Sequence, residues 1–500
     1  MRRAIVIFCW IVVIATGAFL RFEDLGKRPF HADEATGARI TARRMESEGG
    51  RFDPKHYHGP VLHDMAALVC MARGEHGWLT MTKTTLRQPI AIAGTLLLLV
   101  PLLWRKRLGD APVLLAAALL ATSPLLVYYS RMFIHEMLLT LFGMLALGFL
   151  SHARLVAAGF LIGLMFATKE SFAISMIAWT GAGVLVALEN RESLDKKTLV
   201  AWWRANRKPV LIAMLAAAVT SFAFYTDGFT HPAGAVDAVR TFFVYETVAG
   251  HDKTSAYYFQ LLGAPFKSGG MWWFGTPVLA LAAAAFVSSF RKDAPARSTI
   301  RFTAYAALGH FAIYSVIAYK TPWLACLPWA HVCLLAGFAF AGFAKHGLPV
   351  KAALVLLTAA ALATQIQQTR RATGRFAADE RNPFAYVPTR GDVEALENWL
   401  RELRAVAPGG SLEPIAVIGG DYWPLPWYLR GSGRIGYWKS PDTDLTGFPA
   451  VFAMPEETDA VAKMLEHTHT PLPRGLRAGV PVHLFVRNDI WNRWREAGAR

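Results

Sequence analysis

Long apolar runs that carry almost no charge constrain this chain more than any other feature of its sequence. About eleven of them are roughly 15–22 residues long, close to the length that a helix needs to cross a hydrocarbon core of about 30 Å. Charged residues make up only 18 % of the chain, against about a quarter in soluble domains. The runs predict a mainly α fold, a polytopic transmembrane helix bundle. The expected spans are residues 4–20, 86–104, 111–129, 136–150, 154–168, 172–188, 209–226, 275–290, 302–319, 322–343 and 351–367.

The positions of the lysines and arginines predict how this bundle is oriented. The formal net charge is +16, which in a soluble chain would suggest a nucleic-acid partner. Here the basic residues gather in alternate short loops, as the positive-inside rule requires of cytoplasmic loops. We therefore expect no nucleic-acid partner, an inner or plasma membrane location and a cytoplasmic N-terminus, with loops 21–85 and 227–274 outside. The basic loops are residues 105–107, 189–208, 291–301 and 344–350.

The last quarter of the chain has a different pattern. Beyond residue 367 the apolar runs shrink to strand length, at 415–418, 450–453 and 482–486, with helical spacing between turn signals. We expect a small soluble α/β domain over residues 368–500, outside the membrane, after a transmembrane catalytic domain over residues 1–367.

Two adjacent acids follow the first span in the sequence His31-Ala32-Asp33-Glu34. A carboxylate at a membrane-edge cavity is partly desolvated, which raises its pKa and makes it a better base. A structural alternative stays open: Asp33 caps a helix over 34–46, and Glu34 interacts with the dipole of its first turn.

A second acid, Glu136, opens the apolar run that begins the fourth span. An ionised group there is costly without a partner, and Arg131 and His135 are the candidates nearby. A functional role for this group and a purely structural Arg131–Glu136 ion pair both fit the spacing.

Two lysines break the expected charge bias. Lys169, in Thr168-Lys169-Glu170, and Lys320, in Lys320-Thr321-Pro322-Trp323, fall at the outer ends of spans. An outer lysine that runs against the bias can hold a phosphate as a point charge. The alternative is that both lysines extend toward lipid headgroups.

A histidine-rich segment lies in the first outer loop. His56, Tyr57 and His58 precede Gly59-Pro60, and His251 lies far along the chain in the second outer loop. Histidines two residues apart can share a metal on an extended segment. A divalent metal held by His56, His58 and His251 is therefore one interpretation, and hydrogen-bonded loop histidines without a metal are the other.

These motifs, in this order, resemble those of the C-type-fold integral-membrane glycosyltransferases that use polyprenyl-phosphate sugars. Protein O-mannosyltransferases and the bacterial aminoarabinose transferase that acts on lipid A are examples. The closest resemblance is to a branch of membrane proteins called "flippase activity-associated" in glycosylation. The matching segments are His31 to Ala35, Tyr57 to Pro60, Thr168 to Glu170, Lys320 to Trp323 and Asp421 to Tyr428.

The resemblance implies a role for each candidate residue. Asp33 corresponds to the catalytic base and Glu136 to a second active-site acid, with Glu34 beside the base. Lys320 corresponds to a lysine linked to the donor phosphate. Lys169 and Arg131 are expected to bind the same phosphate. One departure is that His58-Gly59-Pro60 stands where the lipid A enzymes carry Glu-Lys-Pro. The expected substrate-binding residues are His31, Tyr57, His58, Glu170 and His251.

The implied partners are a polyprenyl-phosphate-linked sugar, membrane lipids and an acceptor glycan, lipid or protein, with no required cofactor. The alternative functions are a lipid-linked-sugar flippase or transporter, and an accessory scaffold of a glycosylation pathway. Transporters carry polar residues near the bilayer midplane. The charges here cluster at span ends on one side, which favours interfacial chemistry.

Overall fold

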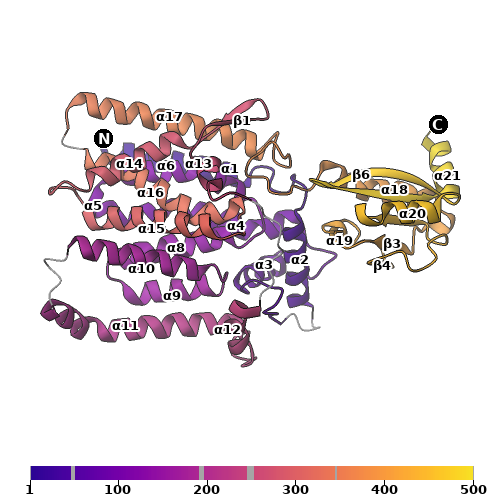
Figure 1. The fold of residues 1–500 in the computed structure, drawn as a ribbon, viewed down its shortest axis with the longest axis horizontal. Coiled ribbons are helices and arrows are strands. Elements are labelled where there is room, and N and C mark those ends of the chain that lie inside the picture. The colour runs from indigo at the N-terminus through magenta and orange to yellow at the C-terminus, as the bar shows by residue number, and fades with distance from the viewer. Residues whose placement is uncertain (1, 47–50, 191–195, 245–252, 344–345, 499–500) are drawn as a thin grey trace.

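The computed structural model describes residues 2–46, 51–190, 196–244, 253–343 and 346–498. In these residues a bundle of side-by-side helices is followed by a small sheet domain beyond one end of the bundle (Figure 1). The predicted fold class, mainly α with a C-terminal α/β part, is confirmed. The helices of the bundle are α1 (Arg2–Phe22), α4 (Lys83–Leu96), η1 (Leu97–Trp104), α5 (Arg105–Leu108), α6 (Asp110–Thr122), α7 (Pro124–Tyr129), α8 (Glu136–Ser151), α9 (Leu155–Phe166), α10 (Phe172–Glu189), α11 (Lys196–Tyr225), α14 (Thr276–Ser288), α15 (Arg297–Val316), η3 (Pro322–Ala325), α16 (Cys326–Gly342) and α17 (Leu348–Thr373).

Each predicted span coincides with one or more of these helices. Six helical stretches among the described residues are long and apolar enough to cross a membrane, and shorter apolar helices lie beside them. The predicted span 111–129 is two helices, because α6 ends at Thr122 and the Ser123 side chain caps α7, where Pro124 is the first residue. Proline is favoured at a first helical position and cannot continue an existing ladder.

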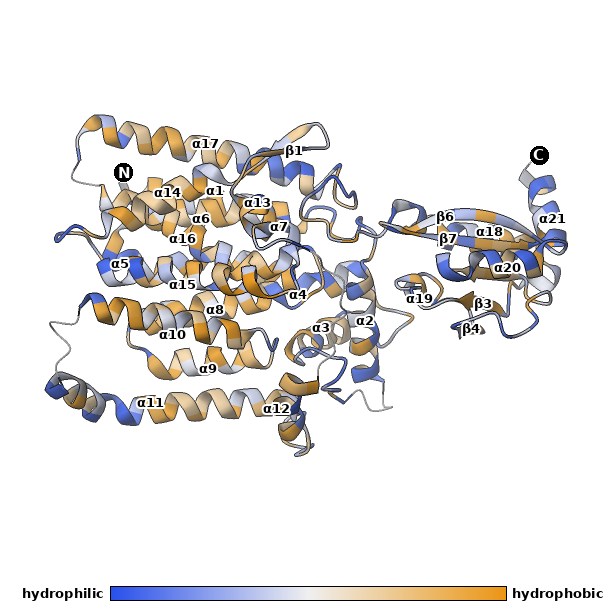
Figure 2. Ribbon diagram, in the orientation of Figure 1, coloured by the Kyte–Doolittle hydropathy of each residue, from blue (hydrophilic) through white to orange (hydrophobic). Residues whose placement is uncertain are grey.

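The two ends of the bundle differ in what they carry. The N-terminus and the basic helix α5 lie at one end, and α2 (Ala32–Met45), α3 (Val61–Ala72) and α12 (Gly234–Val244) lie at the other (Figure 1). Between the two ends, the helices consist mainly of hydrophobic residues (Figure 2). The segments that hold most of the predicted site residues therefore meet at the end away from the N-terminus.

The C-terminal part is a five-stranded mixed sheet in the order β4-β3-β5-β7-β6. β3 pairs in parallel with β4 and β5, and β7 pairs antiparallel with β5 and β6. All residues of β3 and β5 are buried, which explains why both read as short apolar runs. The strands are β3 (Ile415–Ile418), β4 (Ile435–Trp438), β5 (Ala450–Ala453), β6 (His469–Arg477) and β7 (Val480–Arg487).

Short helices surround this sheet, and α19 lies at the edge of the sheet domain nearest α2 (Figure 1). A two-stranded hairpin and one short helix, α13, lie instead beside the bundle. The remaining elements are α13 (Tyr257–Leu262), β1 (Phe266–Ser268), β2 (Met271–Trp273), η4 (Gly391–Val393), α18 (Leu396–Val406), η5 (Pro408–Gly410), α19 (Leu425–Tyr428), η6 (Pro455–Glu457), α20 (Thr458–Leu465) and α21 (Asn488–Gly498).

Candidate active site

Asp33 and Glu34 are neighbours in α2, but their carboxylates lie in opposite environments. The Glu34 side chain is fully buried, with its two oxygens 2.7 Å from Nε and Nη2 of Arg87. The Phe133 amide also donates to it, at 2.8 Å. Burial alone would raise the pKa of Glu34, but the guanidinium groups of Arg87 and Arg28 lower it to about 2. Glu34 is therefore a charged internal anchor.

The Asp33 side chain, by contrast, is 54 % exposed. One of its oxygens lies 3.7 Å from His31 Nδ1, yet that nitrogen accepts a hydrogen bond from the Asp33 amide and so carries no proton. Across the described part of the chain, no lysine or arginine nitrogen lies within 4.0 Å of the Asp33 carboxylate. Asp33 thus offers an accessible carboxylate without a strong cationic partner.

His31 is the residue before α2 and caps its first turn. The alternative in which Asp33 caps a helix over 34–46 is wrong: α2 begins at Ala32, and His31 is its N-cap. The Glu34 carboxylate accepts a hydrogen bond from the His31 amide at 3.0 Å, which completes a capping box. His31 Nε2 lies 3.0 Å from the Tyr386 carbonyl oxygen, so both ring nitrogens are engaged. Burial lowers the pKa of His31, which keeps the imidazole neutral.

Glu136 pairs with Lys169, another of the predicted residues. Glu136 is the first residue of α8, and its Oε1 lies 2.6 Å from Lys169 Nζ, with both side chains buried. The alternative Arg131–Glu136 ion pair is wrong, because Arg131 Nη1 donates to the Leu20 carbonyl at 2.9 Å. Burial would lower the pKa of Lys169, but the nearby Glu136 carboxylate raises it. Each charge of this pair is therefore compensated by the other.

The Tyr57–Pro60 and Thr168–Glu170 motifs pack directly against each other. The amide of Val61 donates to the Ala167 carbonyl at 3.1 Å, and a Cβ at Gly59 would lie 2.2 Å from that carbonyl oxygen. Only glycine allows so close a backbone approach. His58 Nδ1 then lies 3.0 Å from Glu170 Oε2, which helps to lower the pKa of Glu170 to about 2 despite its burial.

The histidines proposed as metal ligands are turned to different carboxylates. His56 Nδ1 lies 2.7 Å from Asp53 Oδ2, whereas His58 faces Glu170. The third predicted ligand, His251, lies outside the described residues. Within the described ranges, no group of three or more histidine, cysteine, aspartate or glutamate side chains could hold a metal ion.

Tyr57 and Arg131 are placed at the margin of the site. The Tyr57 hydroxyl accepts a hydrogen bond from Arg43 at 3.1 Å on an exposed surface. The Arg131 guanidinium faces the Leu20 and Asp24 carbonyl oxygens at the end of α1. Neither side chain shares a hydrogen bond or ion pair with the predicted lysines.

Lys320 and a lysine that the sequence analysis did not single out, Lys253, lie together. Lys320 is 3 % exposed, and its Nζ donates to the Ile317 carbonyl at 2.5 Å. Lys253 Nζ donates to the Lys320 carbonyl at 3.0 Å and lies 4.4 Å and 4.5 Å from the ring centres of Tyr257 and Tyr386. Burial lowers the pKa of Lys253 to about 8. Among the residues the structure describes, neither ammonium has a carboxylate oxygen within 4.0 Å.

Lys253 carried a signal in the sequence that could have been used. It lies in the second predicted outer loop, so it runs against the positive-inside bias just as Lys320 does. Its contact with Lys320 could not be predicted from the sequence, because 67 residues separate the two in the chain.

Tyr386 connects the segment of Asp33 with the two lysines. Its carbonyl oxygen lies 3.0 Å from Nε2 of His31, two residues before Asp33, and the centre of its ring lies 4.5 Å from Lys253 Nζ. The ring centre of Trp323, three residues after Lys320, lies 6.3 Å from that of His31. The segments that carry Asp33, Lys253 and Lys320 therefore meet around His31 and Tyr386.

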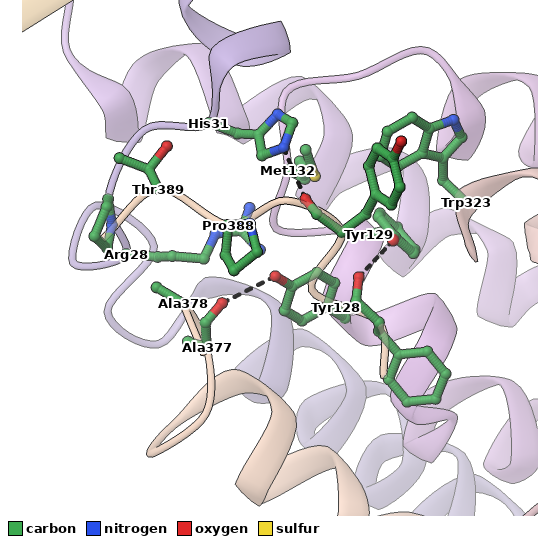
Figure 3. A pocket seen from close by; sticks show the side chains of 13 residues that line it. Arg28, His31, Tyr128, Tyr129, Met132, Trp323, Ala377, Ala378, Pro388 and Thr389 are labelled. Atoms are coloured by element: carbon green, nitrogen blue, oxygen red, sulfur yellow. Dashed lines mark hydrogen bonds between the residues drawn. The ribbon is translucent and has the colours of Figure 1, made fainter. Parts of the chain in front are cut away.

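A narrow pocket opens beside His31, and Figure 3 shows it. Its walls include the rings of Tyr128, Tyr129 and Trp323 and the segment 377–389. The hydroxyls of the two tyrosines donate to backbone carbonyls of that segment at 2.9 and 2.6 Å. The space open to the centre of a water molecule is about 10 Å³, the room of a single water. The residues that line the pocket thus pack behind His31, and the pocket itself is too small for a sugar ring.

No protein-family model matches the chain, and no curated protein matches it. Solved structures do. ArnT from Cupriavidus metallidurans bound to undecaprenyl phosphate is 14 % identical, with a TM-score of 0.63 over 96 % of this chain and 98 % of that one. The archaeal oligosaccharyltransferase AglB from Archaeoglobus fulgidus, in complex with an inhibitory peptide and a dolichol-phosphate, is 12 % identical, with a TM-score of 0.54 over 98 % and 77 %.

This chain has the fold of the C-type membrane glycosyltransferases. The fold resemblance implied by the short motifs is confirmed, even though sequence identity to these structures is low. Together with its apolar helices, the fold makes the chain an integral membrane protein.

Proposed function

We propose that this protein is a membrane glycosyltransferase that moves a sugar from a polyprenyl-phosphate donor to a hydroxyl acceptor, with inversion at the anomeric carbon. Asp33 is the base, and Lys320 and Lys253 bind the donor phosphate. The acceptor is a hydroxyl of a glycan, a lipid or a protein. Support comes from the fold shared with ArnT, solved with undecaprenyl phosphate, and with AglB, solved with a dolichol-phosphate.

The observation that carries the proposal is an imbalance of charge. Lys320 is a buried ammonium and Lys253 a half-buried one, and neither has a carboxylate partner among the described residues. Tyr386, whose ring lies against Lys253 Nζ, also contacts His31 in the segment of the exposed Asp33 carboxylate. Taking a charge out of water is costly unless an opposite charge compensates it. A phosphate bound at the two lysines supplies that charge, and it places the donor sugar near a carboxylate that has no cation of its own.

The reaction follows from these assignments. Asp33 removes the proton from the acceptor hydroxyl as its oxygen attacks the anomeric carbon. The bond from that carbon to the phosphate oxygen breaks on the opposite face, and its electron pair stays on the lipid phosphate. Lys320 and Lys253 stabilise the negative charge that grows there. A phosphate leaves without an added proton, so no general acid is needed, and the acceptor proton ends on Asp33.

The other predicted residues receive supporting roles. Glu34 holds Arg87 and the Phe133 amide, so we assign it to positioning rather than to proton transfer. Lys169 is neutralised by Glu136, so we assign this pair to holding the start of α8 and the loop after α9 together.

We place the site and the sheet domain on the non-cytoplasmic side of the membrane. The basic helix α5 lies at the N-terminal end of the bundle, away from α2 and the sheet domain (Figure 1). Basic segments favour the cytoplasmic side. The sheet domain and Asp33 are at the opposite end.

The test is Asp33→Asn in the full-length protein, reconstituted in vesicles with a radiolabelled polyprenyl-phosphate hexose. Transfer or hydrolysis of the label should fall by about 10²–10⁴-fold, the usual contribution of a positioned base. Asp24→Asn is the matched control, since it makes the same change in the same loop at a left-handed position (φ 49°) that asparagine tolerates. Label that moves across the membrane unchanged, and does so equally in Asp33→Asn, would contradict the proposal in favour of a transporter.

A further inference from the structure

The C-terminal part of the chain holds the segment that carries Asp33. The Phe30 amide donates to the hydroxyl oxygen of Tyr428 at 2.8 Å, and the Thr389 hydroxyl donates to the Phe30 carbonyl at 2.9 Å. The next residue, His31, contacts the Tyr386 carbonyl through Nε2. Both backbone groups of Phe30 and the ring of His31 are thus bonded to residues more than 350 positions away in the chain.

Aromatic packing supports the same contact. The Phe30 ring lies 4.3 Å from that of Trp427 in α19, and both side chains are buried. Trp427 also packs edge-on against Trp78, at 5.5 Å between ring centres, and the Arg430 guanidinium lies 3.6 Å over its ring. The Asp421–Tyr428 motif therefore docks the sheet domain against the loop before α2.

The Tyr428 hydroxyl is fixed in one hydrogen-bonding direction. It accepts from the Phe30 amide, so its single proton goes to the Glu394 carboxylate. Glu394 in turn lies 2.6 Å from Lys83 Nζ at the start of α4. Because Lys83 belongs to the helix bundle, Glu394 connects the Tyr428 hydroxyl of the sheet domain to the bundle.

Asp33 is bracketed by these contacts. On one side Glu34 is clamped by Arg87, and on the other His31 and Phe30 are held by the C-terminal part. Between them, only the Asp33 side chain points to solvent without a cationic partner within the described residues. Its direction is set by neighbours that cannot rotate freely.

The segment 377–389 also connects the base to the phosphate side of the site. Its residue Tyr386 accepts the His31 hydrogen bond through its carbonyl, and the Tyr386 ring lies under the Lys253 ammonium. A shift of this segment would therefore move Asp33 and Lys253 relative to each other.

We propose that Tyr428 is a positioning residue for Asp33, acting through Phe30 and His31, so that the sheet domain completes the active site. This inference rests on the proposed function. It assigns the Asp421–Tyr428 motif a role in turnover and makes Thr389 a second positioning residue at the same backbone unit.

The test compares Tyr428→Phe with Tyr437→Phe in the reconstituted full-length protein. Tyr437 belongs to the same domain, is 39 % exposed, and its hydroxyl makes no hydrogen bond to a described residue. In Tyr428→Phe we expect kcat for sugar transfer to fall by about 10–100-fold, as for a small misplacement of a reacting group. Affinity for undecaprenyl phosphate should stay within about twofold, because the lysines are untouched. Tyr437→Phe should match the wild type.

A second pair of variants guards against a simple folding defect. Thr389→Val should lower kcat in the same way, and Thr389→Ser, which keeps the hydroxyl, should restore it. If Tyr428→Phe lowers kcat and lipid affinity together, or not at all, Tyr428 does not act by positioning Asp33. If Asp33→Asn leaves transfer intact, the proposed function fails instead, whatever Tyr428→Phe does.

Discussion

Two groups of charged side chains meet at one end of the helix bundle, and they differ in whether their charges are compensated. The paired group consists of Glu34 with Arg87, Glu136 with Lys169, and His58 with Glu170. The open group consists of Asp33, Lys253 and Lys320. Within the described residues, no member of the open group has an oppositely charged lysine, arginine or carboxylate within 4.0 Å.

The difference separates residues that hold the site from residues that remain available to a ligand. Each ion pair of the paired group joins segments distant in sequence, such as the start of α8 and the loop after α9. Breaking a buried pair leaves an uncompensated charge, so these residues fix loops in place. The charges of the open group are not compensated by one another or by neighbours in the described residues. A donor phosphate can compensate the two lysines, and an acceptor hydroxyl can donate a hydrogen bond to Asp33.

The largest effect should come from breaking the paired group. Glu34→Gln removes the anion from a fully buried Arg87, which should cost about 3–5 kcal/mol. The folded-state pKa of Glu34, about 2, lies below its usual value of 4.5. Its contribution to stability is therefore present above pH 4.5 and lost as the pH falls toward 2. Thermal unfolding in detergent, followed from pH 7 to pH 3, measures both effects.

Asp33→Asn is the control for this experiment, because it changes the adjacent residue of the same helix. It should leave thermal stability near that of the wild type while it removes activity. Equal destabilisation by the two variants would abolish the distinction between the paired and open groups.

A smaller effect on binding should come from the open group. Lys320→Met removes a buried ammonium that has no carboxylate partner in the described ranges. It should weaken binding of undecaprenyl phosphate by about 10–100-fold, the value of one or two charge-assisted contacts. Stability should be unchanged or higher, because an uncompensated charge is lost. Quenching of tryptophan fluorescence by the lipid measures the affinity.

Lys27→Met, at an exposed position of the first loop, controls for the general loss of a positive charge. Weak binding in both variants would point to non-specific attraction of the lipid phosphate, and would contradict a specific role for Lys320.

The bundle was predictable from sequence because its signal is local. An apolar run long enough to cross a membrane forms a helix wherever it lies, since lipid leaves no other partner for its backbone groups. The break between α6 and α7 at Ser123-Pro124 is not predicted, because two residues interrupt the apolar run 111–129 too briefly to end a span.

The candidate site was predictable only in part. Asp33 and Lys320 stand out because they break a local rule, an acid or a lysine where topology does not require one. The pairing of charges was not readable, because the partner of Glu34 lies 53 residues away and that of Glu136 lies 33 away. For the same reason the spacing suggested Arg131 as the partner of Glu136, whereas the fold supplies Lys169.

The smallest effect, and the one most specific to the open group, is a dependence of lipid binding on pH through Lys253. Its pKa is lowered to about 8 by burial, so its ammonium is charged at pH 7 and largely neutral at pH 9. The phosphate monoester already carries most of its second charge above pH 7, since that pKa is about 6. Affinity for undecaprenyl phosphate should therefore fall, by no more than about 10-fold, between pH 7 and pH 9.

Lys253→Arg decides whether this lysine is the cause. A guanidinium keeps its charge throughout this range, so the variant should bind the lipid with little change between pH 7 and pH 9. The same fall in wild type and Lys253→Arg would assign the dependence to another group. A flat profile in both would mean that the ammonium of Lys253 does not face the phosphate, and Lys320 would then be the remaining phosphate-binding member of the open group.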